Sequence, residues 1–238
     1  MEPGPVPAVD VKKLPSLTNL NGSLSERMYT AIKKAILSLD FLPGSSIPKS
    51  DICDHLGVSR SPVSEALAKL SGEGLVEIIP QSGTSVSRLS MNAIREDTFL
   101  REALEVAASR HAAVHRTPEV VARLNRNFEM QKLLIKDVDK EDFIRTDAEF
   151  HNIIMATTGV SRLHATVEAV STQVDRARRL LIPESGRLAE TVDEHIKILN
   201  AIQNQDEQAA GEAMRYHVRQ LLRRLETLET DRPDLVSG

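Results

Sequence analysis

Hydrophobic residues recur at intervals of three and four positions over most of this chain, which is the pattern of amphipathic helices. The first such segment spans 24–40 and is ended by Phe41-Leu42-Pro43-Gly44. Shorter helical stretches follow at 49–56 and 59–73, with Gly57 between them. The pattern therefore predicts three helices early in the chain.

Two short β patterns come next. Residues 75–79 and 84–87 flank Pro80-Gln81-Ser82-Gly83, which predicts a small hairpin. We expect the three helices and the hairpin to form one domain over 24–90. Residues 1–23 contain four prolines and no sustained period, so we expect a flexible N-terminal tail.

Beyond Ser90 only long helical patterns remain, and short breaks separate them. They span 91–115, 118–136, 139–157, 160–181, 187–204 and 206–229. Six helices with tight connections predict an antiparallel six-helix bundle over 91–230, followed by a C-terminal tail at 231–238. A strand, glycine-loop and helix unit is not found, which makes a nucleotide-binding fold improbable. The predicted fold class is mainly α.

Composition narrows the possible partners. Aromatic residues make up 3% of the chain, with no Trp, so stacking of single-stranded bases is not expected. The net charge is −4, and residues 24–90 hold seven Lys or Arg against seven Asp or Glu, so DNA binding needs cations gathered on one face. A single cysteine, Cys53, excludes an internal disulfide. Because no signal peptide or membrane-length apolar run is visible, we expect a cytoplasmic protein without a membrane partner.

Residues 52–67 have the physical features of a helix-turn-helix. Gly57 permits the sharp turn between the two helices, and Ser59 can cap the second one. The start of that helix offers Arg60 to guanine edges, and hydroxyl groups to phosphates. A helix-turn-helix that mediates only protein contacts is the alternative.

The motifs of this region resemble the GntR superfamily of bacterial repressors. The matching residues are Leu42-Pro43-Gly44, Leu56-Gly57-Val58-Ser59-Arg60-Ser61-Pro62-Val63, Glu65-Ala66-Leu67, Leu70 and Glu73-Gly74-Leu75-Val76. The resemblance implies a winged helix-turn-helix in which Arg60 meets bases and the hairpin is a wing with Gly83 at its tip. It departs at Ser64, where the family usually has arginine. The expected DNA-binding residues are Arg60, Ser59, Ser61, Ser64, Lys49 and Gly83 of a homodimer on a double-stranded operator.

Four polar residues lie on apolar helix faces in the second half of the chain. Asp147 and His151 are one turn apart and point the same way. His195 and His217 each share a face with aliphatic residues of their own helices. Burying these groups is costly unless they have partners. A divalent ion such as Zn²⁺, Ni²⁺ or Mn²⁺ is one such partner, and a hydrogen-bonded network without metal is the alternative.

Residues 91–229 resemble the FadR-type ligand-binding domain of the same superfamily, the FCD domain. The matching residues are Leu100-Arg101, Leu104-Glu105, Asp147, Phe150-His151, Glu194-His195, Ile198-Leu199, Ala201-Ile202, Asp206, Ala210 and His217. The resemblance implies that Asp147 and the three histidines hold a metal beside a pocket for carboxylate-bearing metabolites. It also implies that Arg101 reaches the ligand, although Arg101 has an alternative partner in Glu105. Arg178 is a second candidate for ligand contact.

The sequence therefore predicts a transcriptional regulator, a repressor, whose helical domain binds a metal and a small organic acid, and not an enzyme. A metal-free sensor of the same architecture is the first alternative. A metal-dependent hydrolase is the second, but it needs a general base, and Glu194 points about 100° away from His195 on the helical wheel.

Overall fold

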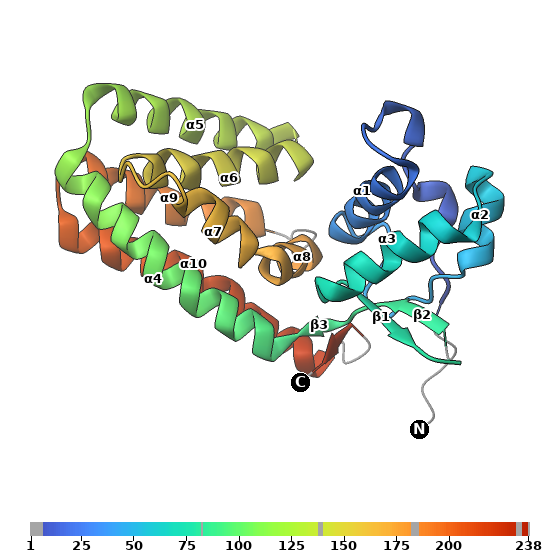
Figure 1. Cartoon of the computed structure of the whole chain (residues 1–238). Coiled ribbons are helices and arrows are strands. Elements are labelled where there is room, and N and C mark those ends of the chain that lie inside the picture. Colours follow the sequence, from blue (N-terminus) through green and yellow to red (C-terminus); the bar gives the residue numbers. More distant parts are fainter. Residues whose placement is uncertain (1–6, 82, 138–139, 182–185, 232–234, 238) are drawn as a thin grey trace. The chain divides into compact units, whose positions relative to one another are not determined.

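A computed structural model describes residues 7–81, 83–137, 140–181, 186–231 and 235–237. The chain divides into two compact units, an N-terminal unit of Met1–Met91 with Leu228–Gly238, and a helical unit of Asn92–Thr227. Figure 1 shows the elements of both units. In the described residues no helix combines the length and the apolar character needed to cross a bilayer.

The N-terminal unit contains three helices and a two-stranded antiparallel sheet. Its main elements are α1 (Leu24–Leu37), α2 (Lys49–Leu56), α3 (Arg60–Gly72), β1 (Val76–Ile79) and β2 (Gly83–Val86). Helix α1 begins at a capping box formed by Ser23 and Glu26, and packs against α3. The fold class predicted for this part, a winged helix-turn-helix, is confirmed.

Both ends of the chain contribute to this unit, where the sequence predicted only tails. Short 3₁₀ helices occupy Val11–Lys13 and Leu17–Asn19, and Val9 and Leu14 are buried in the core. At the other end, β4 (Val236–Ser237) pairs in parallel with β3 (Leu89–Ser90). Isolated aliphatic residues in a proline-rich stretch carry no period, so their packing was not visible in the sequence. Residues 1–6, 232–234 and 238 of the expected tails lie outside the described residues.

In its described residues the helical unit contains seven helices where six were expected. They are α4 (Met91–His115), α5 (Pro118–Asp137), α6 (Lys140–Ala156), α7 (Leu163–Ala169), α8 (Thr172–Leu181), α9 (Arg187–Gln203) and α10 (Glu207–Asp231). The stretch predicted as one helix over 160–181 is α7 and α8. The Ser171 hydroxyl donates to the Val167 carbonyl, and the Asp175 amide donates to the Ser171 carbonyl, so the polar groups of the break are satisfied locally.

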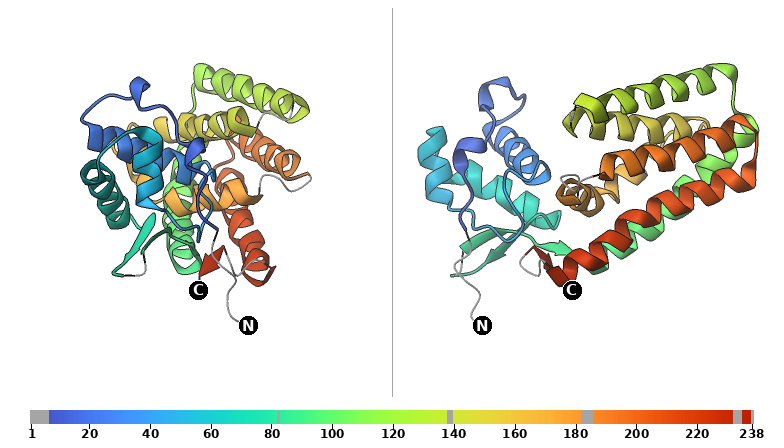
Figure 2. Two further views of the ribbon diagram at one scale, coloured as in Figure 1. Left: turned by 90° about the vertical axis from the view of Figure 1, so that its right-hand side faces the viewer. Right: turned by 180° about the vertical axis from the view of Figure 1, so that it is seen from behind.

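The long helices α4 and α10 run side by side in opposite directions, as Figure 1 and the views in Figure 2 show. Arg215 and Arg219 of α10 both bond to Glu102 of α4. Helix α5 packs against α6 and α9 around a core that includes Phe150, Ile198 and Ile202. This bundle brings α6, α9 and α10 close enough for their inward side chains to meet.

Candidate functional site

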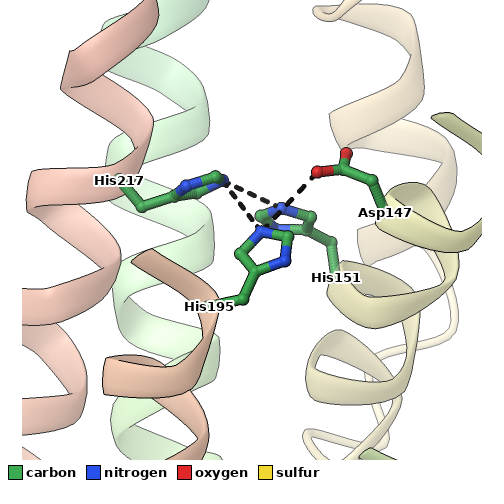
Figure 3. Close-up of side chains that lie close together, drawn as sticks. All are labelled: Asp147, His151, His195 and His217. Carbon is green, nitrogen blue, oxygen red and sulfur yellow. Dashed lines mark hydrogen bonds and ion pairs between the residues drawn. The ribbon is translucent and has the colours of Figure 1, made fainter. Parts of the chain in front are cut away.

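Four inward side chains converge in the helical unit. Asp147 and His151 come from α6, His195 from α9 and His217 from α10, and all four are buried. One ligand atom from each lies within 4.8 Å of the corresponding atoms of the others. Figure 3 shows the three imidazoles and the carboxylate pointing toward one another. We call these four residues the Asp-His₃ cluster.

The nitrogen atoms that face each other are the Nε2 atoms of the histidines. His217 Nε2 lies 3.2 Å from His151 Nε2 and 3.4 Å from His195 Nε2, and the latter lies 3.6 Å from an Asp147 oxygen. Ligand atoms bound at about 2.0–2.1 Å to a common ion stand about 3.0–3.4 Å apart. Imidazole and carboxylate are also the ligand types that suit Zn²⁺, Ni²⁺ and Mn²⁺. The residues present therefore fit a divalent metal ion.

Each imidazole has a buried partner at its other nitrogen. His217 Nδ1 lies 2.7 Å from Glu194 Oε2, and His195 Nδ1 lies 2.7 Å from Gln131 Oε1. His151 Nδ1 lies 2.5 Å from Glu105 Oε2, an ion-pair contact without regular hydrogen-bond geometry. Partners of this kind orient the ring and direct Nε2 toward the shared centre.

Burial sets the protonation of the cluster. Removal from water lowers the pKa values of His195 and His217 well below the usual histidine value. Burial is the largest single effect on Asp147 and opposes its charged form, but the Arg178 guanidinium and the three histidines together outweigh it and hold the pKa of that carboxyl below its usual range. At neutral pH the cluster therefore offers the neutral imidazoles of His195 and His217 and an ionised Asp147 carboxylate, the forms that bind metal.

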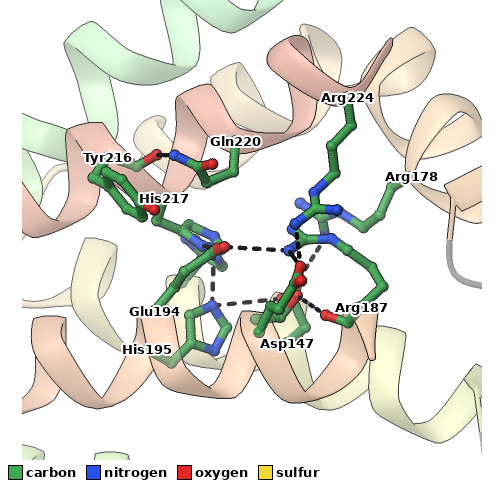
Figure 4. Close-up of polar contacts among 12 residues, drawn as sticks. Asp147, Arg178, Arg187, Glu194, His195, Tyr216, His217, Gln220 and Arg224 are labelled. Atoms are coloured by element: carbon green, nitrogen blue, oxygen red, sulfur yellow. Dashed lines mark hydrogen bonds and ion pairs between the residues drawn. The ribbon is translucent and has the colours of Figure 1, made fainter. Parts of the chain in front are cut away.

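Three arginines surround the cluster. Arg101 Nε donates to Glu105 Oε1 at 2.7 Å, so the pairing considered for Arg101 from the sequence is present. Arg178 Nη1 donates to Asp147 Oδ2, and Arg187 Nη1 donates to Glu194 Oε1 at 3.2 Å, as Figure 4 shows. Guanidinium groups beside a cation site favour anionic guests.

Two cavities meet at the cluster, and both are lined by Arg101, Asp147 and Arg178. The smaller, of about 30 Å³, also reaches His217 and Arg187, and has room for no more than a water molecule or two. The larger, of about 180 Å³, is lined further by His151, Asn152, Met155, His164, Val167 and Ser171, among others. Only the larger has room for a small organic molecule.

The second partners of the histidines, Glu105, Gln131 and Glu194, were not predicted from the sequence. Glu194 belongs to the residues that match the FCD domain, and the one role considered for it was that of a general base, against which its direction about 100° away from His195 argued. That same direction takes it to His217 on α10. Gln131 carried no signal, because a glutamine in a helix is usually exposed.

The helix-turn-helix has the geometry that its sequence predicts. Gly57 adopts the left-handed conformation, with φ 64° and ψ 37°, between α2 and α3. Arg60 is the first residue of α3 and is exposed, as are Ser59 and Ser61. The expected capping by Ser59 is absent, because its side chain makes no cap hydrogen bond. The Ser61 hydroxyl lies 3.0 Å from Glu65 Oε1.

The remaining DNA-binding candidates differ in their exposure and in the elements that carry them. Ser64 and Lys49 are half-buried, on α3 and at the start of α2. Gly83 is exposed and pairs with Ile79 beside the hairpin turn, with φ 115°. A positive φ there favours glycine.

Comparison with known proteins identifies both units. Residues 24–86 match the model of the gntR family of bacterial regulatory proteins, and residues 98–220 match that of the FCD domain. An uncharacterized HTH-type transcriptional regulator of Streptomyces ambofaciens is 33% identical over 220 residues, which cover 92% of each chain. The HTH-type transcriptional repressor RspR of Escherichia coli K12 is 28% identical over 92% of this chain and 97% of its own.

Solved structures agree on the fold. A GntR transcriptional regulator from Rhodococcus sp. RHA1 has a TM-score of 0.71 at 19% identity, and covers 87% of this chain and 99% of its own. Escherichia coli McbR/YncC has a TM-score of 0.68 at 20% identity, with the same coverage. The chain belongs to the gntR family of bacterial transcriptional regulators, which are not enzymes, and its helical unit is an FCD domain.

Proposed function

We propose that this regulator is a cytoplasmic, homodimeric repressor whose FCD domain binds one divalent metal ion and a small carboxylate-bearing metabolite. The observation that carries the proposal is the convergence of Asp147, His151, His195 and His217 on one buried point. The name of the repressor RspR among the relatives supports the repressing role.

The metal would be held by the Asp147 carboxylate and the three Nε2 atoms. Four protein ligands leave coordination positions open on an ion that accepts five or six. When bound, the ion supplies a positive charge that attracts a carboxylate oxygen. His151 and Asp147 line the larger cavity, so a guest in that cavity lies next to the cluster.

The metabolite would be recognised by Arg101 and Arg178. Both line the larger cavity, and a guanidinium fork matches the two oxygens of a carboxylate. Both arginines are paired with protein carboxylates in this structure, so a guest must compete with Glu105 and Asp147. Binding that is tighter in one arrangement of the protein than in another would couple the metabolite to DNA binding.

The operator would be read by α3. Arg60, the first residue of α3, would fork onto a guanine, and Ser59, Ser61 and Ser64 near the same helix start would contact phosphates together with Lys49 on α2. Gly83 allows the wing to approach the DNA backbone closely. Two copies related by a two-fold axis would meet two half-sites about one helical turn apart.

A thermal-shift screen of small organic acids tests the sensing part. Acids that bind are expected to raise the melting temperature of the zinc-loaded protein and to lose this effect after treatment with a chelator. Equal stabilisation with and without chelator would support the metal-free sensor instead. The acids that bind are then added to complexes with duplexes selected by the protein from random sequence, and retention in a gel should change.

A further inference from the structure

The imidazole of His195 stands at the end of a chain of hydrogen bonds that begins at the backbone. Asn127 Nδ2 donates to the carbonyl oxygen of Thr146 at 2.9 Å. Gln131 Nε2 donates to Asn127 Oδ1 at 2.8 Å, and Gln131 Oε1 lies 2.7 Å from His195 Nδ1. The chain runs from α6 through α5 to α9, and starts one residue before the cluster residue Asp147.

Every link in this chain has one possible direction. A backbone carbonyl only accepts, so the Asn127 atom that faces Thr146 must be its nitrogen. The Asn127 oxygen then accepts from the Gln131 nitrogen, which turns the Gln131 oxygen toward His195. Because that oxygen only accepts, His195 Nδ1 must carry the hydrogen, and Nε2 keeps its lone pair.

We propose that Asn127 and Gln131 are positioning residues that hold neutral His195 in the Nδ1–H tautomer. His195 Nε2 is then free to face Asp147 and His217. Gln131 and His195 are both fully buried, so water does not replace either partner. The consequence for metal binding rests on the proposed function, whereas the tautomer is a property of the metal-free protein.

The other two imidazoles show why His195 needs a longer chain. His217 and His151 face the carboxylates of Glu194 and Glu105, whose oxygens accept whichever way they turn. An amide presents an acceptor only when it is correctly oriented, and Asn127 provides that orientation for Gln131. A neutral partner also avoids one more buried negative charge beside Asp147.

A different amide pair, which joins α5 and α9 as the Gln131–His195 hydrogen bond does, provides a matched control. Gln203 of α9 donates to Asn125 of α5 at 3.0 Å, and Asn125 donates to the carbonyl of Val121 at 2.9 Å. Neither amide lines a cavity at the cluster. Gln203→Met therefore removes a comparable α5–α9 hydrogen bond without touching a cluster histidine.

Nitrogen-15 NMR of the metal-free protein reports the tautomer of each histidine. We expect Nδ1–H for His195 in the wild type and in Gln203→Met, a shift toward Nε2–H in Gln131→Met, and a mixture in Asn127→Leu. Gln131→Glu restores an acceptor and should keep Nδ1–H. Zinc affinity, measured by competition with a chelator, should fall about 10–100-fold in Gln131→Met and stay within a few-fold of wild type in Gln131→Glu.

The two measurements separate this inference from the proposed function. If the wild type binds no zinc, the metal proposal fails, while the tautomer shift still tests the hydrogen-bond chain. Retention of Nδ1–H in Gln131→Met would overturn the inference. So would an equal loss of the tautomer in Gln131→Glu, because packing rather than the acceptor would then be responsible.

Discussion

Arg178 Nη1 lies 2.5 Å from Asp147 Oδ2, so the carboxylate of the Asp-His₃ cluster has a cationic partner within the protein. The pair lies between the two cavities, because both residues line both of them. The other oxygen of this carboxylate, Oδ1, faces His195 Nε2 at 3.6 Å, so a metal in the cluster would bind Oδ1 while Arg178 holds Oδ2.

Replacing Arg178 with Gln should change the affinity for the metal and the affinity for the organic acid in opposite directions. The variant removes a positive charge next to the metal site, so zinc affinity should rise about tenfold. Affinity for an organic acid found in the screen should fall, because a guanidinium fork is lost. Titration calorimetry with each ligand measures both effects. A fall in both affinities would contradict this expectation and indicate a general loss of structure.

Replacing Arg60 with Ala should weaken operator binding by about 1–3 kcal/mol and relax the preference for the base pair that it meets. Lys34→Ala, which removes a charge from the exposed face of α1, is the control for net charge. Gel retention on the selected duplex and on a scrambled duplex measures the change. Unchanged retention by the Arg60 variant would remove this residue from the contact surface.

Replacing Asp97 with Asn should stabilise the protein at neutral pH. Burial, and to a smaller extent the neighbouring Glu96, raise the pKa of Asp97 to about 6 from an ordinary value of 3.8. The unfolded chain therefore releases this proton more readily, so the charged carboxylate opposes folding above pH 6 and opposes it less as the pH falls toward 4. The gain in unfolding free energy should be about 1 kcal/mol at pH 7.5, after allowance for solvent screening.

Chemical denaturation of wild type and Asp97→Asn at pH 7.5 and pH 5 measures this gain. It should fall to about half or less at pH 5, because the carboxyl in the folded protein is then mostly protonated. A gain that is independent of pH would show that the substitution acts through packing or helix propensity.

Local periodicity explains what the sequence could predict about the site. Asp147 and His151 are four residues apart on a helix that also carries apolar residues, so their shared inward direction follows from 3.6 residues per turn. Convergence with His195 and His217 depends on how three helices pack, which spacing alone does not specify. The resemblance to the FCD domain supplied that step, and the geometry of the four side chains agrees with it.

The features that escaped prediction depend on contacts between helices. Spacing does not reveal Glu105, Gln131 and Glu194 as partners of the histidines, because only the packing of α4, α5 and α9 buries them beside the cluster. The break between α7 and α8 contains no Gly or Pro, the residues that most strongly mark a helix end. The burial of Val9 and Leu14 similarly depends on a core to which distant residues contribute.

The most direct test of the account is the metal content of the protein. The wild type, purified without chelator and without an immobilised-metal column, is exposed to Zn²⁺, Ni²⁺ or Mn²⁺, desalted and analysed for metals by mass spectrometry. We predict about one ion per chain in the wild type and a marked loss in a combined Asp147→Asn and His217→Gln variant. A wild type that retains no stoichiometric ion under any of these conditions would contradict the account.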